Sequence, residues 1–407
     1  MAVRVNPDNA SRTLPLEQII SIALLTPMGD PTTANCVWGA PLLIWGSPGI
    51  GKSARVNAAS EASGLHMEAV FSAGHHPEDF TGIPVRKDAG GLHRVCALEE
   101  VNRLVDLGKG VLCLEEISCA PPAVQAALLK VVLNRFIGDT ILPNGVRIVS
   151  AANPPEEAAG GWELEPPLAN RFIHIEEQPP SANDWGEWLL NGDNLAVTDY
   201  RTGEATVTKN WGSEWPRIKG LLYGFARRRP ALLYNLPVEG DKARGRAWPS
   251  PRSWVTAGRL AATCNALGLN LSDQLDMIQA AVGAGAASEW MTWITEANLP
   301  SPEHMLRNGW DPNPTRLDQA LAAYGSVAMY VTSQSDQKLR REYAGQAWNL
   351  FGTAMKANMP DIVVPAARLF VNNGLGLSAG GDLGKAAKPV MAKLGMGGFT
   401  QLAVQQK

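Results

Sequence analysis

The most constraining feature of this chain is a glycine-rich loop that directly follows a short apolar segment, residues 41–45. In such a loop the backbone N–H groups turn inward toward an anion, a lysine reaches the β- and γ-phosphates, and a hydroxyl at the start of the next helix can ligate Mg²⁺. A glycine-rich turn whose lysine and serine face solvent is the alternative, and it requires too many coincidences. The chain is therefore predicted to bind a nucleotide through Gly46, Ser47, Pro48, Gly49, Ile50, Gly51, Lys52 and Ser53.

The net charge, the hydropathy and the cysteines of the chain argue against a general nucleic-acid-binding protein, a membrane-spanning protein and a secreted protein. With 407 residues the chain can form two or three domains, and its net charge of -3 gives no general attraction to nucleic acid or anionic membranes. No apolar run approaches the roughly 18 residues that a membrane span needs. The chain shows no secretory signal pattern and its cysteines have no CxxC spacing, which predicts a reducing cytoplasm. The five cysteines are Cys36, Cys96, Cys113, Cys119 and Cys264.

Short apolar segments alternate with helical patterns between residue 41 and about residue 177. This alternation predicts an α/β fold in which a parallel sheet is flanked by helices. The predicted strands are residues 42–45, 68–72, 110–114, 147–152 and 172–176.

The predicted domain organisation places a nucleotide-binding core at residues 41–180 after an N-terminal helical segment, 1–40. Residues 181–247 are rich in tryptophan and punctuated by glycine and proline, so we expect a linker with small inserted elements whose tryptophans pack rather than bind. Residues 248–375 are predicted to form an α-helical lid and a C-terminal helical region, and residues 376–407 a flexible tail.

Two carboxylates follow the apolar segment 110–114. They fit the end of a buried strand, where Glu115 would lie on the Mg²⁺ side of the site and Glu116 would polarise the attacking water. The metal-side acid is more usually Asp, and the extra methylene of Glu115 can make its metal contact water-mediated or weaker. The alternative is a pair of solvated acids at a strand end.

With the loop and the acids, residues 151–154 and 168–172 resemble the ordered motifs of AAA+ ATPases, and those of the MoxR branch in particular. The resemblance implies that Asn153 is the sensor 1 residue that orients the attacking water. An amide suits this role because it can donate to the γ-phosphate and accept from water. A plain Asn-Pro turn is the alternative interpretation of this position.

Two arginines complete the site that the resemblance implies. Arg171 matches the arginine finger that reaches the nucleotide of a neighbouring subunit, although Asn170 stands where the family has Asp. Arg252, in the motif 248–254, matches sensor 2, which contacts the γ-phosphate in cis from the start of a lid helix. A surface salt bridge for Arg171 and an ordinary exposed helix position for Arg252 are the alternatives.

Two further segments fit the same branch. Residues 76–82 with Gly90, Gly91 and Leu92 resemble an insertion that projects toward the pore of a ring. Residues 134–146 resemble the hairpin before sensor 1. Both are equally compatible with simple surface hairpins.

The resemblance covers about residues 15–275 and implies an ATPase that needs ATP and Mg²⁺ and works as a ring, expected to be a hexamer. Such a ring remodels, activates or inserts metal into a partner, often with a von Willebrand A domain protein. A low-turnover nucleotide-gated scaffold, suggested by Glu115, is one alternative. A DNA-acting ATPase is another, although the only obvious basic cluster is residues 227–229, and we expect neither nucleic acid nor membrane as a partner. No guanine-reading Asn-Lys-x-Asp motif is present.

Overall fold

The computed structural model describes residues 12–86, 91–158, 160–191, 197–376 and 380–395. The chain divides into two compact units, of which the first comprises residues 1–209 and 234–288 and the second comprises residues 210–233 and 289–407. Two helices, α8 (Tyr200–Arg228) and α11 (Ala284–Ala297), run from one unit into the other.

A five-stranded parallel sheet forms the centre of the first unit, with the strand order β2-β5-β8-β1-β9. Each strand lies within two residues of its prediction, because short runs of mainly apolar residues are typical of the buried strands of a parallel sheet. The five strands are β1 (Leu42–Trp45), β2 (Met67–Phe71), β5 (Lys109–Glu115), β8 (Gly145–Ala152) and β9 (Ile173–Glu176).

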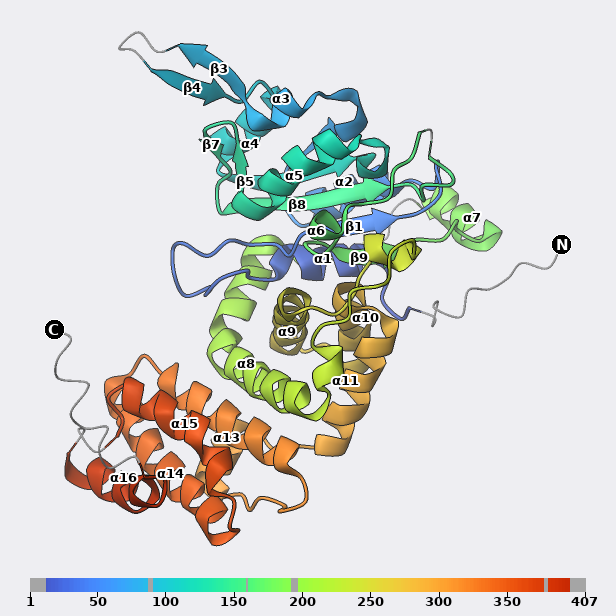
Figure 1. The fold of residues 1–407 in the computed structure, drawn as a ribbon. Helices are drawn as coiled ribbons and strands as arrows, with labels where there is room; N and C mark the ends of the chain where they lie inside the picture. Colours follow the sequence, from blue (N-terminus) through green and yellow to red (C-terminus); the bar gives the residue numbers. More distant parts are fainter. Residues whose placement is uncertain (1–11, 87–90, 159, 192–196, 377–379, 396–407) are drawn as a thin grey trace. The chain divides into compact units, whose positions relative to one another are not determined.

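Helices cover both faces of this sheet (Figure 1). On one face α4 (Glu99–Leu107) and α5 (Pro122–Asn134) pack their buried side chains against alternate strand residues such as Leu43 and Leu112. The other face is covered by α2 (Lys52–Ala62), which contacts β5 and β8 and packs against α1 (Leu16–Leu25). Successive side chains of a strand point to opposite faces of the sheet, so an apolar strand contributes apolar side chains to both faces.

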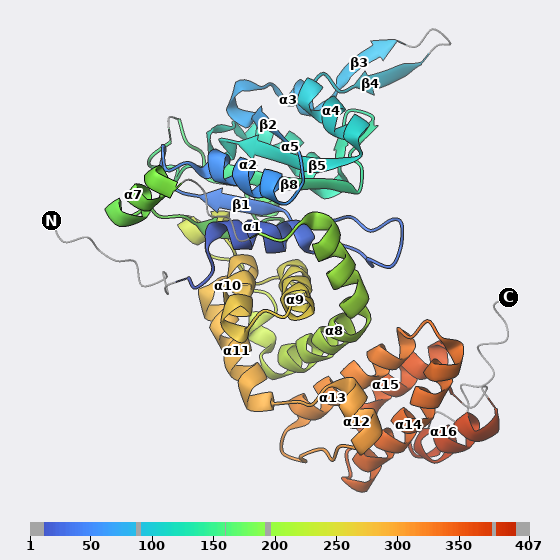
Figure 2. The same cartoon turned by 180° about the vertical axis from the view of Figure 1, so that it is seen from behind.

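Hairpins form in both segments for which the sequence suggests them. After α3 (Pro77–Thr81), β3 (Ile83–Arg86) and β4 (Leu92–Val95) pair antiparallel and extend away from the sheet in Figures 1 and 2. The shorter hairpin joins β6 (Phe136–Ile137) and β7 (Thr140–Ile141). Gly90 lies outside the described residues.

The first unit also contains the helices that follow the sheet. The short α6 (Pro166–Ala169) lies just before β9, and α7 (Ala182–Asn191) just after it. Two longer helices, α9 (Pro251–Ala266) and α10 (Leu271–Val282), pack on each other, and α10 also contacts β9. The described part of this unit also has the 3-10 helices η1 (Ser72–Gly74), η2 (Ile117–Cys119) and η4 (Lys242–Gly245), whereas η3 (Pro230–Leu232) belongs to the second unit.

The tryptophan-rich segment differs from the predicted linker, because 29 of its residues form the helix α8. The glycines and Pro216 obscure this helix in the sequence, but its buried residues recur at helical spacing: Val207, Trp211, Ile218, Leu221 and Phe225. Trp211 and Trp248 are buried, as expected of packing residues, whereas Trp185 and Trp188 on α7 are 53% and 50% exposed.

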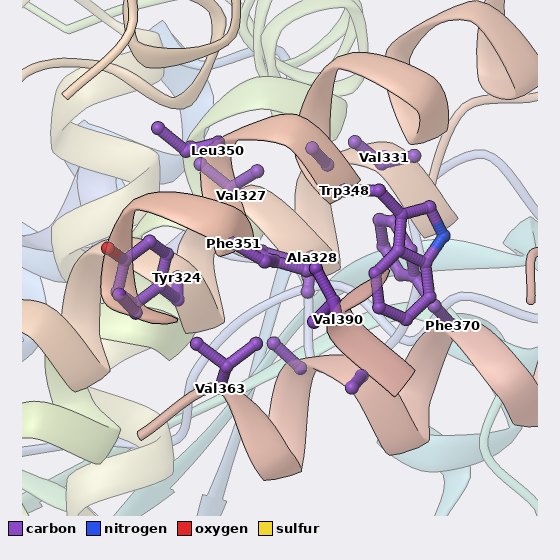
Figure 3. Packing of buried hydrophobic residues seen from close by; sticks show 14 of the residues in the cluster. Tyr324, Val327, Ala328, Val331, Trp348, Leu350, Phe351, Val363, Phe370 and Val390 are labelled. Atoms are coloured by element: carbon purple, nitrogen blue, oxygen red, sulfur yellow. The ribbon is translucent and has the colours of Figure 1, made fainter. Parts of the chain in front are cut away.

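The second unit is helical and has its own hydrophobic core (Figure 3). Trp348 contacts Phe351 and Phe370 edge to face at the centre of this core. Part of the predicted flexible tail, residues 381–393, is a helix because Leu383 and Val390 bury their side chains in the same core. The helices that lie wholly in this unit are α12 (Pro302–Asn308), α13 (Leu317–Thr332), α14 (Gln337–Lys356), α15 (Pro360–Asn372) and α16 (Gly381–Lys393). Throughout the described ranges, no helix combines the length and apolarity that a bilayer span requires.

Two leucines of the second unit provide a matched test of this core. Leu350 is 4% exposed and Leu317 is 54% exposed. We expect Leu350→Ala to lower the free energy of unfolding by about 2 to 5 kcal/mol, because it removes buried apolar surface and leaves a cavity. The same change at Leu317 is expected to cost less than about 1 kcal/mol. Urea unfolding followed by tryptophan fluorescence measures both, and equal costs would contradict the described packing.

Candidate nucleotide-binding site

The candidate site lies where three neighbouring parallel strands end at the same edge of the sheet. The phosphate-binding loop follows β1, Glu116 follows β5, and Asn153 follows β8. The register pairs Trp45 with Ala152, which brings the loop and Asn153 to the same level. Carboxyl ends of parallel strands are the usual place for a ligand in an open α/β sheet.

The loop has the backbone conformation that its glycines allow. Gly49 and Gly51 have φ of 82° and 84°, in the left-handed region that side-chain-bearing residues rarely adopt. Gly51 is the N-cap of α2, so the first N–H groups of that helix point toward the site. The glycine pattern that predicts an anion-binding loop is therefore realised in the backbone.

A cavity of about 260 Å³ opens between this loop and the ends of β5 and β8. Five of the eight predicted loop residues line it, together with Glu115, Glu116 and Asn153 from the two strand ends. The full set of lining residues is Pro48, Gly49, Gly51, Lys52, Ser53, Ala54, Glu115, Glu116, Ala151, Ala152 and Asn153. The structure thus brings together the loop, both acids and the amide that the sequence singles out.

Lys52 is held at the mouth of the loop by oxygen atoms. Its Nζ donates to the carbonyl oxygens of Gly46 at 2.7 Å and Ser47 at 3.0 Å, and to Asn153 Oδ1 at 2.8 Å. Burial lowers the pKa of Lys52, and the negative charge of Glu116 partly opposes this effect. A partly desolvated ammonium whose partners include only neutral oxygens has a strong electrostatic preference for an anion.

Asn153 joins Lys52 to Glu116. Its Nδ2 donates to both carboxylate oxygens of Glu116, each at 3.0 Å. The backbone of Asn153 is fixed as well, because its carbonyl accepts from Ser118 Oγ at 2.8 Å. One amide therefore contacts both the phosphate-binding lysine and the candidate base.

Glu116 has an unusual backbone. Its φ of 55° and ψ of 39° place it in the left-handed region, where a residue with a Cβ is disfavoured by about 1 kcal/mol or more. It caps η2, whose last residue, Cys119, also contacts the Glu116 carboxylate. Strained residues of this kind concentrate at functional sites.

Arg171 and Arg252 lie outside the residues that line the cavity. Arg171 is half-buried, and its Nη1 donates to the Pro167 carbonyl oxygen. Burial lowers the pKa of Arg171, and the positive charge of Arg252 lowers it further. Arg252 is exposed in the first turn of α9. Contacts of these two arginines with a nucleotide remain predictions.

The structure explains how Asn170 can stand where the family has Asp. Its Oδ1 accepts from Ser250 Oγ at 2.8 Å, and its Nδ2 lies 3.4 Å from the Trp248 carbonyl oxygen, to which it donates. Ser250 is the N-cap of α9, so Asn170 links the segment carrying Arg171 to the helix carrying Arg252. A carboxylate could accept but not donate here.

An ion-pair network beside the loop was not predicted from the sequence. Arg55 of α2 donates to Glu17 at 2.6 Å and also pairs with Glu177, which accepts from Arg12 at 2.7 Å. Burial alone would raise the pKa of Glu17, but the hydrogen bonds that its carboxylate accepts from Arg55 and from its own backbone, together with the positive charges of Arg55 and Arg12, outweigh burial and the pKa falls. The network fixes α2 and α1 against the end of β9, and no local motif marks it because its members are far apart in sequence.

A buried histidine connects the strand before the loop to the segment before Arg171. Trp45 Nε1 donates to His174 Nδ1 at 2.9 Å, so His174 Nε2 carries the proton and donates to the Ala169 carbonyl oxygen at 2.9 Å. The Arg246 guanidinium lies 3.4 Å from the centroid of a Trp45 ring. Burial lowers the pKa of His174 to about 4, so the ring is neutral at pH 7.

This histidine makes a testable contribution to stability. The folded pKa of about 4 lies below the ordinary 6.5, so the stabilisation is complete above pH 6.5 and is lost as the pH falls toward 4. Between pH 7 and pH 5 we expect the free energy of unfolding to fall by about 2 kcal/mol on account of His174. Urea unfolding at both pH values should show a smaller fall for His174→Gln, and an equal fall would contradict the assignment.

The side chains that line the cavity include oxygen donors of the kind that Mg²⁺ prefers. Among the residues that the structure describes, no group of three or more His, Cys, Asp or Glu side chains could hold a metal ion by itself. Mg²⁺ bound with a nucleotide needs only one or two protein ligands, because phosphates and water supply the rest. A hydroxyl on Ser53 and a carboxylate on Glu115, both lining the same cavity, fit that requirement.

Comparison with known proteins identifies the nucleotide-binding core. Residues 41–172 match the family model of the AAA domain of the dynein-related subfamily. A solved structure from Cytophaga hutchinsonii ATCC 33406, described as a "putative ATPase", aligns over 65% of this chain and 78% of its own, with 19% identity and a TM-score of 0.40. No protein with a curated function matches the chain. The family match and the sheet order confirm the predicted P-loop fold of the AAA+ type.

Proposed function

We propose that the AAA+ ATPase domain formed by residues 41–172 hydrolyses MgATP and uses the energy to remodel a partner protein. One observation carries the catalytic part of this proposal: Asn153 contacts both Lys52 and Glu116 in the cavity beside the phosphate-binding loop. A phosphate-binding cation, a polar sensor and a carboxylate base are the side chains that phosphoryl transfer to water needs.

Each of the three residues has a distinct role in this proposal. Lys52 exchanges its carbonyl partners, Gly46 and Ser47, for the β- and γ-phosphates of the substrate. Glu116 takes a proton from the attacking water, and Asn153 orients that water and donates to the γ-phosphate. Asn153 already contacts both Lys52 and Glu116. A single amide side chain would therefore lie between a phosphate bound by Lys52 and the proposed base, Glu116.

Ser53 and Glu115 are the proposed magnesium ligands. When bound, Mg²⁺ would neutralise the charge that develops on the phosphate oxygens. Glu115 is one methylene longer than the usual Asp, so we expect its contact to pass through a water molecule. That difference is the main chemical departure of this site from the family pattern.

Assembly into a ring of the MoxR type, with six subunits, is part of the proposal. The motifs at Asn153, Arg171 and Arg252 support it through their order in the sequence. Arg171 lies outside the cavity lining of its own chain, as an arginine that completes a neighbouring site would. Arg252 in the first turn of α9 would contact the γ-phosphate in cis after closure of the lid.

The partner and the compartment are proposed from the resemblance and from the cysteines. A MoxR-type ring would activate its target as a chaperone does, or insert metal into it, together with a von Willebrand A domain protein. All five cysteines are unpaired, which supports the cytoplasm as the location. The nucleotide-gated scaffold remains the second candidate, because the longer side chain of Glu115 would reduce turnover; DNA remodelling has only residues 227–229 in its favour.

Steady-state hydrolysis by the Lys52→Ala variant tests the ATPase proposal. We expect the affinity for ATP to fall about 100-fold, equivalent to about 2.7 kcal/mol, because the variant loses the cation that faces the phosphates. Lys130→Ala removes an exposed lysine of α5 and serves as the control, with an unchanged rate and affinity. If wild-type and Lys52→Ala bind ATP differently but hydrolyse it equally slowly, the scaffold is the correct function.

A further inference from the structure

We propose that Cys119 is a positioning residue for ATP hydrolysis, which holds the Glu116 carboxylate in place through a hydrogen bond from its thiol. The inference rests on the proposed ATPase function and adds a residue that the catalytic motifs do not include. Cys119 lies three residues after Glu116, at the end of η2.

Two contacts join these residues. Cys119 Sγ lies 3.0 Å from Glu116 Oε2, and the backbone N–H of Cys119 donates to the Glu116 carbonyl oxygen at 2.9 Å. The same residue therefore holds both the main chain and the side chain of Glu116. Because Glu116 is in a disfavoured backbone conformation, this local support matters more than it would in a regular strand or helix.

The protonation state of the thiol suits a donor. Burial raises the pKa of Cys119 to about 11, and the hydrogen bond and negative charge of Glu116 raise it as well. The thiol is therefore protonated at neutral pH, and its S–H can donate to the Glu116 carboxylate that lies against it. The contact is a thiol donating to a carboxylate, not a thiolate next to an acid.

Cys119 differs from Asn153, the other donor to Glu116. Asn153 also accepts from Lys52, and both are proposed to contact phosphate, so their hydrogen bonds must change when a nucleotide binds. Cys119 and Glu116 belong to one short turn, and their contact does not depend on the loop. The thiol can therefore keep the base oriented while Asn153 changes partners.

Kinetics of Cys119→Ala and Cys119→Ser test the positioning role. We expect Cys119→Ala to lower kcat about fivefold with KM for ATP within about twofold, because the base loses a donor that does not contact the nucleotide. Cys119→Ser restores a hydroxyl donor and should recover at least half of kcat. Cys264→Ala, a buried cysteine of α9, is the matched control and should behave as wild-type. An unchanged or increased kcat in Cys119→Ala overturns the proposal.

A double variant separates positioning from general disruption. In a Glu116→Gln background there is no carboxylate base to position, so adding Cys119→Ala should lower the residual rate by less than about twofold. A further fivefold loss in that background would show that Cys119 acts elsewhere, and would overturn the proposal.

Thiol alkylation tests the contact without any turnover. Cys119 is half-buried and the other four cysteines are buried, so iodoacetamide at pH 8 should react first at Cys119, and Cys119→Ala identifies that reaction. Glu116→Gln removes the negative charge that disfavours the thiolate, so alkylation should accelerate about threefold or more. An unchanged rate would overturn the contact. If alkylation accelerates but wild-type shows no hydrolysis that depends on Lys52, the ATPase proposal and the positioning role of Cys119 fail while the contact stands.

Discussion

Glu116→Gln is expected to lower kcat for ATP hydrolysis about 1,000-fold while leaving the affinity for ATP within about threefold of wild-type. Gln has the shape of Glu but cannot take a proton from water. The amide can still accept hydrogen bonds from Asn153 and Cys119, so the site should keep its structure. Steady-state hydrolysis and titration with a fluorescent ATP analogue measure the two quantities separately.

The control for this variant is Glu342→Gln, the same substitution at an exposed position of α14. Its rate should equal that of wild-type. A Glu116→Gln protein that hydrolyses ATP at more than about a tenth of the wild-type rate would show that another group activates the water. Loss of ATP binding in Glu116→Gln would instead indicate that the substitution has disrupted the loop.

Arg171→Ala is expected to lower kcat about 1,000-fold as well, but for a different reason. In the proposed ring, a guanidinium supplied by the neighbouring subunit would stabilise the charge on the transferring phosphoryl group, so the variant should still bind ATP in its own site. Steady-state hydrolysis and the same fluorescent titration measure these effects.

Mixing the two variants distinguishes a neighbour's arginine from one that acts within its own chain. An Arg171→Ala subunit keeps its own Glu116, and an adjacent Glu116→Gln subunit supplies an intact Arg171, so mixed assemblies should regain hydrolysis that neither variant shows alone. Absence of recovery in assemblies shown to be mixed would contradict the trans role. Mass measurement of Glu116→Gln with ATP should show a ring of six copies, and a persistent monomer that binds ATP would contradict the ring.

The parallel sheet could be predicted because each strand is recognisable from its own short apolar run in the sequence. The apolar runs around Leu43 and Leu112 are continuous, as is typical of strands buried on both faces, and the run around Val149 is interrupted only by Arg147 and Ser150. The polar residues that follow these runs mark the edge of the sheet where a ligand is expected. The helix α8 could not be predicted in the same way. Gly212 and Pro216 interrupt its pattern, because both residues have low helix propensity.

The residues of the site also divide into those that a sequence motif marks and those that none marks. That Lys52, Glu116 and Asn153 lie around one cavity could be predicted because each has a fixed position in a motif at a strand end, while their roles stay predictions. The contact of Cys119 with Glu116 could not be predicted. It depends on a left-handed backbone at residue 116, and a glutamate in the sequence does not indicate that conformation. Glu177 and Arg12 were missed for a third reason: they meet across 165 positions of sequence.

The left-handed backbone at Glu116 places the proposed activity and the stability of the fold in opposition at one position. Glycine would adopt the same φ and ψ without steric cost, so selection for stability alone would favour glycine there by about 1 kcal/mol. Laboratory evolution of this protein for heat resistance, with no demand for turnover, should therefore accumulate glycine at this codon and produce a more durable protein that no longer hydrolyses ATP.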